Sequence, residues 1–361
     1  MRPDPPTVGV EEEFLLLDPP TWRNVPAADE LRVALPESLR ERDHAQFRSS
    51  KVEMVTPVCA TLAELSDRLA ENRTAAAAAA RRCGARLVAV GATPVAEPDL
   101  TEVDTPRFHA IVEQYGPIAQ DPALCGCHVH VGVPSRELAL EVCNHLRPWL
   151  PVIQAMGVNS PWYAGTDSRH ASWRGIALER WPNLGPWPLL DSPEDYEQAV
   201  DELVGTGVML DATMGLWWAR PSTRYPTVEI RVGDVSPTAD DAVLVAGLVR
   251  ALVGTAVGDI AAGRPALRMP EQLLRAAHWN ASHQGLGGTL TDLWERCARP
   301  AWELVDRLHE TVAPALERHG DAALVAAGLD RLRTLGTGAD RQRRAGDLPR
   351  ALANLADQTA G

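Results

Sequence analysis

The stretch "TVGVEEEFLLLD", residues 7–18, places three consecutive carboxylates inside an apolar run. With the period of two that side chains follow along a β-strand, Glu11 and Glu13 share one face and Glu12 lies on the other. Both faces also carry large apolar side chains, so the stretch predicts a strand buried on both sides. Burying an unpaired carboxylate costs several kcal/mol or forces its protonation. Acids at these positions therefore need a partner.

Three further stretches repeat the combination of polar and apolar residues. Glu53 lies in "KVEMV", His128 and His130 share one face of "CHVHVGV", and Glu229 and Arg231 share one face of "VEIRV". In the last two stretches valine and isoleucine fill the opposite face. We expect these polar faces to line one concave sheet together with the acids of the first strand.

The order of elements predicts an α+β fold, with a curved, mainly antiparallel sheet that lines the site and helices packed outside it. Long helical or loop segments separate the expected strands, which lie within residues 7–18, 43–57, 86–94, 126–134 and 227–235. Helices are expected over 61–84, from 135, and over 240–262, 269–284, 289–319 and 321–334. Residues 157–192 are expected to form a long loop, and 335–361 a loop with a short last helix. We interpret residues 1–361 as a single catalytic domain with its core at about 7–335.

The composition limits the class of protein. Hydrophobic residues make up 45% and charged residues 23%, which is normal for a soluble globular protein. The net charge of −13 argues against a nucleic-acid or membrane-surface binder. We expect a cytoplasmic protein whose partners are small molecules. The sequence leaves open whether the protein forms a homo-oligomer. The sole lysine, Lys51, is interpreted mainly as coding bias, with a role in the site as the minor alternative.

The set of ligand types favours a hard divalent cation. Glu11, Glu13, Glu53 and Glu229, with His128, offer carboxylates and an imidazole but no thiolate, which suits Mg²⁺ or Mn²⁺. Each residue alone has an ordinary interpretation: a strand glutamate is usually a solvated edge residue, and a glutamate beside an arginine is often an ion pair. The sequence has no Gly-rich phosphate-binding loop, so bound ATP would be held by metal and arginines.

Several motifs together resemble the carboxylate–amine ligase family, also called glutamate–cysteine ligase type 2. They are "GVEEEFLLLD", "VEMVTPV", "CGCHVHVGV", "NSPWYAGTDSRHASWR", "RWPNLGPWP" and "VEIRVGDVSPTADDA", in the family's order over residues 7–335. The resemblance implies a sheet curved around the active site, related to glutamine synthetase and the guanidino kinases. It also implies ATP-dependent, ADP-forming ligation of a carboxylate to an amine.

The resemblance carries over residue by residue. The family's metal-binding motifs correspond to Glu11 and Glu13, to Glu53, to His128, and to Glu229 followed by Arg231.

Glu53 and Arg231 are the catalytic candidates, with Arg231 on the phosphoryl oxygens because its guanidinium can hold two of them. His130, Arg169 and Arg174 are candidates for binding substrate or phosphate; for the two arginines a surface ion pair is an equal alternative.

One departure concerns "HWNASHQGLGG", residues 278–288, where the family usually has arginines near Asn280 and His283. This difference bears on the acid and amine substrates more than on the ligation chemistry. Three hypotheses follow from the sequence. The first is a ligase for glutamate and cysteine or for another acid–amine pair, the second a phosphotransferase, and the third a non-catalytic metal or nucleotide sensor.

Overall fold

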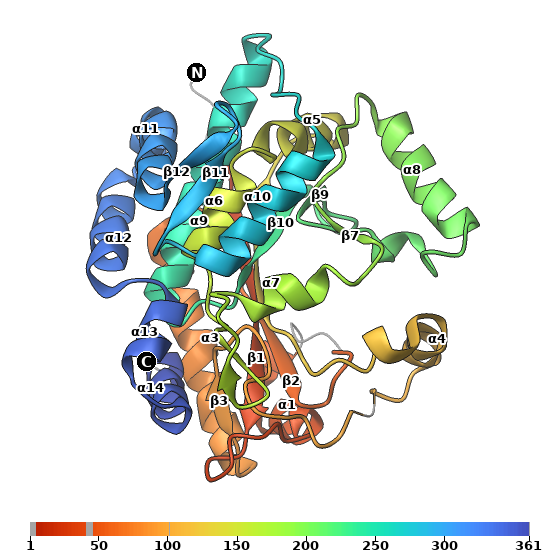
Figure 1. The fold of residues 1–361 in the computed structure, drawn as a ribbon, viewed down its shortest axis with the longest axis vertical. Helices are drawn as coiled ribbons and strands as arrows, with labels where there is room; N and C mark the ends of the chain where they lie inside the picture. Colours follow the sequence, from red (N-terminus) through yellow and green to blue (C-terminus); the bar gives the residue numbers. More distant parts are fainter. Residues whose placement is uncertain (1–4, 41–45, 101, 361) are drawn as a thin grey trace.

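The computed structural model describes residues 5–40, 46–100 and 102–360. Its main sheet has the order β2-β1-β4-β10-β9, β3 pairs with the C-terminal half of β1, and all these pairings are antiparallel (Figure 1). The strands of this sheet are β1 (Val8–Leu17), β2 (Lys51–Val55), β3 (Arg86–Val88), β4 (Gly126–Gly132), β9 (Ala219–Pro221) and β10 (Thr227–Asp234). The α+β fold with a mainly antiparallel sheet is therefore confirmed.

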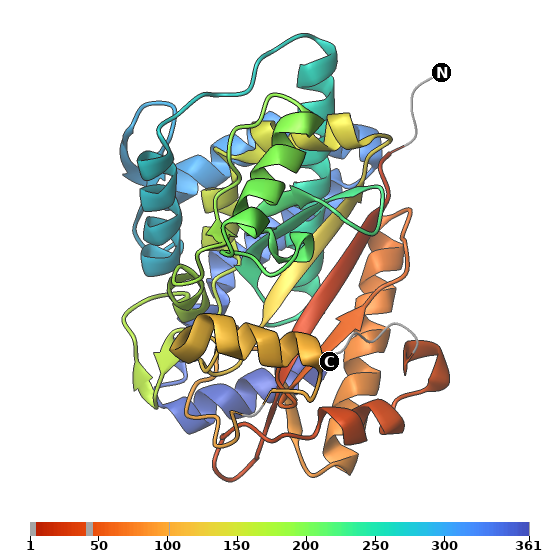
Figure 2. The same cartoon turned by 90° about the vertical axis from the view of Figure 1, so that its right-hand side faces the viewer.

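Helices pack on the apolar face of this sheet (Figure 2). Val10, Val129 and Ile230 from three strands lie in one core cluster with Leu65 and Leu248 from the two longest helices. The helices of the chain are α1 (Ala28–Ala34), α2 (Glu37–Arg40), α3 (Leu62–Arg82), α4 (Pro106–Tyr115), α5 (Arg136–Leu146), α6 (Leu150–Met156), α7 (Trp173–Leu178), α8 (Pro193–Gly205), α9 (Ala239–Ala261), α10 (Glu271–Gln284), α11 (Ala301–His319), α12 (Ala322–Leu335), α13 (Gly338–Arg344) and α14 (Leu348–Ala360). The alternation in the strands thus leaves the opposite, polar face free to build a site.

Local signals explain the two long helices behind the sheet. The hydroxyl of Thr61 accepts a hydrogen bond from Glu64 N, which caps α3 as its sequence predicts. Four of the six alanines in 75–80 are buried against the core. Helix α9 is long and apolar enough to cross a membrane by composition, but 61% of its most apolar window is buried inside the protein. It is a core helix.

Two predicted elements are wrong in part. The helix expected over 289–319 begins only at Ala301, because β11 (Thr289–Asp292) and β12 (Cys297–Pro300) form a hairpin before it. The carboxylate of Asp292 accepts hydrogen bonds from Trp294 N and Glu295 N and closes the turn. The strand expected over 86–94 ends at Val88.

The segments expected as loops contain more structure than the sequence indicates. Residues 157–192 hold the hairpin of β5 (Trp162–Tyr163) and β6 (Thr166–Asp167), then α7, then β7 (Leu184–Gly185), which pairs in parallel with β8 (Leu216–Trp217). Ser172 caps α7 by accepting from Gly175 N. Residues 335–361 contain both α13 and α14. In the segment 43–57, which is expected to hold a strand, residues 43–45 lie outside the described residues, and the strand itself is β2.

Candidate active site

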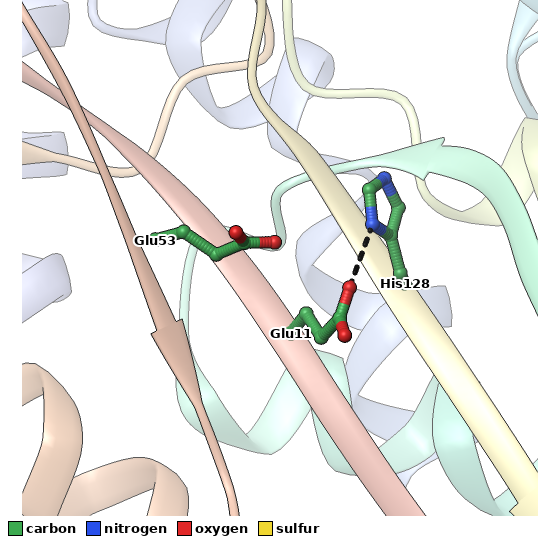
Figure 3. A group of neighbouring side chains, drawn as sticks. All are labelled: Glu11, Glu53 and His128. Atoms are coloured by element: carbon green, nitrogen blue, oxygen red, sulfur yellow. Dashed lines mark hydrogen bonds and ion pairs between the residues drawn. The ribbon is translucent and has the colours of Figure 1, made fainter. Parts of the chain in front are cut away.

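Strand register brings the predicted polar residues onto one face of the sheet. Glu11 lies opposite His128 in the β1–β4 pairing. Across β4 and β10, Glu229 lies opposite His130, and Glu13 lies opposite Glu53 across β1 and β2. Figure 3 shows Glu11, Glu53 and His128 on neighbouring strands with their polar ends turned toward one another. The shared polar face expected from alternation is therefore present.

Two groups of side chains have the spacing of metal ligands. Glu11, Glu53 and His128 place one ligand atom each within 4.8 Å of one another, and so do Glu11, His130 and Glu229. Glu11 belongs to both groups, so two cations would share its carboxylate. The donors are carboxylates and imidazoles without a thiolate, which fits Mg²⁺ or Mn²⁺.

The charges on this face also favour the binding of a cation. Burial, together with the charges of Glu11 and Glu13, raises the pKa of Glu53 to about 8. Gln46 Nε2 donates to Glu53 Oε2 at 2.6 Å. Glu53 thus keeps a proton at neutral pH. A divalent cation bound beside it would stabilise the ionised carboxylate instead.

Glu11 is held in its charged form by the two histidines. Its Oε2 lies 3.2 Å from His128 Nδ1 and its Oε1 lies 3.3 Å from His130 Nε2. Burial opposes the charge, but these contacts outweigh it and hold the pKa of Glu11 well below its usual value. Burial and the charge of Arg231 lower the pKa of His128, which keeps its imidazole neutral as a metal ligand requires.

The carboxylate of Glu13 is paired with a lysine ammonium and with a backbone N–H group. Its Oε1 accepts from Lys51 Nζ at 2.7 Å, and its Oε2 accepts from Gly126 N at 2.6 Å. Burial opposes ionisation, but the nearby Lys51 ammonium lowers the pKa of Glu13 to about 2. The carboxylate lies beside the two ligand groups without belonging to either. Its role as a metal ligand stays a prediction.

Lys51 is a site residue that sequence analysis treated mainly as composition. Its side chain is only 13% exposed and ends on Glu13. The signal that could have found it is its position: two residues before Glu53 on the same strand, it shares that glutamate's face.

Arg231 lies where β10 is irregular. The β4–β10 register shifts between Ile230 and Gly233, and Arg231 N donates to Trp218 O at 2.8 Å. The guanidinium contacts the Glu229 carboxylate through Nη1, and that carboxylate also accepts from Arg220 Nε at 2.8 Å. Arg220 was not identified from the sequence, since only the β9–β10 pairing brings it opposite Glu229.

Arg174 is buried behind Arg231, with 4% of its surface exposed. Its Nη2 donates to Arg231 O at 3.3 Å, while its Nη1 has no hydrogen-bond partner among the described residues. Gly126 makes room for it, since a Cβ there would overlap with Arg174 Nη2. Arg174 therefore belongs to the site.

One sequence candidate, Arg169, and the two positions that depart from the family, Asn280 and His283, lie away from this face. Arg169 is exposed, with φ of +62°, and its backbone N donates to Asp167 Oδ1. Asn280 donates to Thr289 O, and His283 stacks on Trp279. These residues line neither the ligand groups nor the cavity described next. The structure thus separates Arg169 from Arg174, which the sequence treated alike.

A cavity of about 280 Å³ opens beside one end of the polar row. It shares Glu13, Lys51, His128, Arg174 and Arg231 with the site, and its other walls come largely from α4, α7 and the segments around them. In Figure 2 the gold helix α4 lies in front of the sheet on this side. A small molecule in the cavity would meet the charged residues at its inner end.

Comparison with known proteins decides the family. Residues 7–354 match the family described as "Glutamate-cysteine ligase family 2 (GCS2)". The chain belongs to this family. The match reaches beyond the expected core of 7–335 and includes α13 and part of α14.

Named relatives cover nearly the whole chain. A protein of Salinispora tropica named "Putative glutamate--cysteine ligase 2" is 56% identical over 99% of this chain and 97% of its own length. One of the same name from Salinispora arenicola is 57% identical over 98% of this chain and 95% of its own. The chain is therefore a member of a family of ATP-dependent carboxylate–amine ligases, as the sequence motifs predict.

The fold of this family member is shared with distant solved structures. A glutamate–cysteine ligase of Francisella tularensis, solved in complex with AMP, aligns with a TM-score of 0.73 at 11% identity, over 100% of this chain and 90% of that one. A bifunctional glutathione synthetase of Pasteurella multocida aligns with a TM-score of 0.67 at 16% identity, over 99% of this chain and 52% of that one. At these identities the likeness concerns the fold.

Proposed function

We propose that this family member joins a carboxylic acid to an amine, using ATP and Mg²⁺ or Mn²⁺ and releasing ADP and phosphate. The observation that carries the proposal is the pair of ligand groups that share Glu11, placed beside Arg231 and next to a cavity. A binding module for one metal ion would not need acids on three strands together with the half-buried guanidinium of Arg231.

The proposal puts one cation at each of the two ligand groups. Glu11, Glu53 and His128 would hold one ion, and Glu11, His130 and Glu229 a second. Divalent cations at these positions would neutralise the charge of the ATP phosphates. They would also neutralise the charge that develops during phosphoryl transfer.

The reaction has two steps. A carboxylate oxygen of the acid attacks the γ-phosphorus of ATP, the bond to the β,γ-bridging oxygen breaks, and ADP leaves. The amine nitrogen then attacks the carbonyl carbon of the acyl phosphate, phosphate departs with the bonding electron pair, and the nitrogen loses a proton. Both steps gather negative charge on oxygen, which fixed cations stabilise.

The chain's own residues position and stabilise these groups. Arg231, beside His128 and next to the cavity, is placed to hold the transferring phosphoryl oxygens through two of its N–H groups. Glu229 and Arg220 fix the guanidinium through the shared carboxylate. The walls of the cavity limit the access of water to the acyl phosphate.

The substrate pair is the finer part of the proposal. The relatives' name points to glutamate and cysteine, and a different acid–amine pair fits the same chemistry. The arginines expected near Asn280 and His283 are absent, which favours examining other pairs.

The test is a mass-spectrometric screen of acid and amine libraries with ATP and Mg²⁺, scored for new amides and for ADP. We expect one ADP per amide, formed only when acid and amine are both present. Stoichiometric ADP with a single nucleophile and a stable phosphorylated product would replace the ligase with a phosphotransferase. Arg264 is exposed and does not line the cavity, so Arg264→Lys serves as the control for arginine variants.

A further inference from the structure

A second cavity, the C-terminal groove, has a volume of about 470 Å³ and shares no lining residue with the active-site cavity. It forms where the N-terminus of α9 meets α12, α13 and α14. In Figure 1 these three C-terminal helices lie along the left edge, whereas α4, which walls the active-site cavity, lies on the right. A groove of this size accommodates a small molecule.

Arginine side chains dominate the lining of the C-terminal groove. Arg331 comes from α12, Arg341 and Arg344 come from α13, and Arg350 comes from α14. Among the described residues that line the groove, Asp240 is the one acid. The chain as a whole carries a net charge of −13, so this gathering of positive charge is a local feature that favours an anion.

Arg344 and Arg350 are exposed and available to a ligand. Nε of Arg344 donates to Asp340 O at 3.3 Å, and neither guanidinium forms an ion pair within the described part of the chain. The acids nearest to them in sequence serve helix N-termini instead. Asp340 accepts from Thr337 N and Oγ1, and Asp347 accepts from Arg350 N.

Arg331 and Arg341 are engaged to different degrees. Asp241 holds Arg341 through two hydrogen bonds, of 2.7 and 3.0 Å. Arg331 lies 3.7 Å from both Asp240 and Asp241, and its buried Nε has no hydrogen-bond partner among the described residues. An unpaired guanidinium N–H is costly when it is buried. Three of the four guanidinium groups thus keep N–H donors for a ligand.

The arrangement of the donors favours a phosphate group over a carboxylate. Guanidinium groups carried by three helices cannot all share the two coplanar oxygens of one carboxylate. A phosphate ester offers three acceptor oxygens that point in different directions, and each can accept from an arginine. Asn354 and Gln358 follow Arg350 at intervals of four residues on one face of α14, so their amides add donors to the same wall.

We propose that the C-terminal groove binds a phosphate-bearing small molecule, with a phosphate group held by Arg331, Arg344 and Arg350. This anion site is separate from the active site, and it does not depend on the proposed ligase function. Because the three arginines belong to three helices, the bound molecule ties α12, α13 and α14 together.

The test is isothermal calorimetry on the full chain in EDTA, with pyrophosphate as the probe and citrate as a carboxylate anion of similar charge. Without metal, the acids of the active site repel both anions. We expect pyrophosphate to bind with a Kd below about 1 mM, and at least about tenfold more tightly than citrate. No binding of pyrophosphate, or binding of citrate that is equally tight, would overturn the proposal.

Paired substitutions connect the binding to the groove. Arg344→Gln with Arg350→Gln should weaken pyrophosphate binding by about tenfold or more, and Arg350→Gln alone should weaken it several-fold. Arg81→Gln with Arg318→Gln is the matched control, since these arginines are exposed on α3 and α11, outside the groove, and the same charge is removed. Equal weakening by both pairs, or by neither, would overturn the proposal.

Hydrogen exchange locates the site without any substitution. Saturating pyrophosphate should slow amide exchange in α13 and α14, because the bound anion opposes the local opening of helices that it connects. Slower exchange confined to α4 and α7, beside the active-site cavity, would place the anion in the ligase site and overturn the proposal.

Discussion

Glu13 and Glu53 lie directly opposite each other on β1 and β2, an arrangement of like charges that ordinarily destabilises a sheet. The two glutamates resolve it differently. Glu13 pairs with Lys51 and ionises, whereas Glu53 keeps its proton, with its pKa raised to about 8 by burial and by Glu11 and Glu13. Without a cation, the neighbouring carboxylates of the site repel one another. A bound divalent cation would neutralise this repulsion.

The pH dependence of metal-free stability should report on Glu53. A pKa raised on folding contributes stability that is fully present below the unfolded value of about 4.5 and is lost as the pH rises through about 8. Glu53→Gln removes this titration, so the variant should lose less melting temperature between pH 5 and 8 than the wild type in EDTA. Glu71→Gln, on an exposed part of α3, should behave as the wild type. Parallel pH profiles for wild type and Glu53→Gln would refute the assignment.

Binding of Mg²⁺ should release a proton. Because Glu53 is protonated at neutral pH without metal, coordination must displace that proton. Calorimetry at pH 7 in buffers of different ionisation enthalpy should give up to about one proton released per protein, and none in Glu53→Gln. Proton release that persists in that variant would mean another group is titrating.

The two histidines should differ in importance. His128 contacts Glu11 and Arg231 and lines the cavity, whereas His130 is held by Thr227 Oγ1 at 3.0 Å. His128→Ala should lower kcat more than His130→Ala, measured as ADP release under saturating ATP. The reverse order would indicate that the ion next to Glu229 carries more of the catalysis.

Arg231→Lys should separate catalysis from ion pairing. Lysine keeps the charge but loses the planar pair of donors, so kcat should fall by about 10²-fold or more while ATP affinity changes far less. If Arg231 only balances Glu229, kcat would stay within a few-fold of wild type and the melting temperature would fall. Arg264→Lys should change neither quantity.

Glu12→Gln and Glu11→Gln should differ in what they impair, the first mainly stability and the second mainly ligation. Glu12 is 1% exposed on the far face of β1 and forms a two-bond ion pair with Arg73. Glu12→Gln should lower the free energy of unfolding by about 3–5 kcal/mol, because it leaves a buried guanidinium uncompensated. Glu11→Gln should abolish ligation with a smaller loss of stability in EDTA. Denaturant unfolding of both variants tests this, and equal losses would contradict the separation of the two faces.

The sequence alone determined which face of its own strand each side chain occupies. Alternation is a local property of an extended chain, so Glu11, Glu53, His128, Glu229 and Arg231 could be placed on one face from their positions within each strand. The same rule assigned Glu12 to the opposite, structural face. The order of motifs was sufficient for the family, which the comparisons confirm.

Only the tertiary structure decided the partners of these residues. His128 and Glu11 are 117 positions apart in the sequence. They meet because β1 and β4 pair, and that pairing depends on burial across the whole core. The pairing of Glu13 with Lys51, the presence of Arg220, and the burial of Arg174 but not Arg169 all depend on contacts between distant segments. The cavity likewise forms from segments that no local period connects. Periodicity sets the face of a side chain, whereas long-range packing sets its neighbours, its charge state and the space beside it.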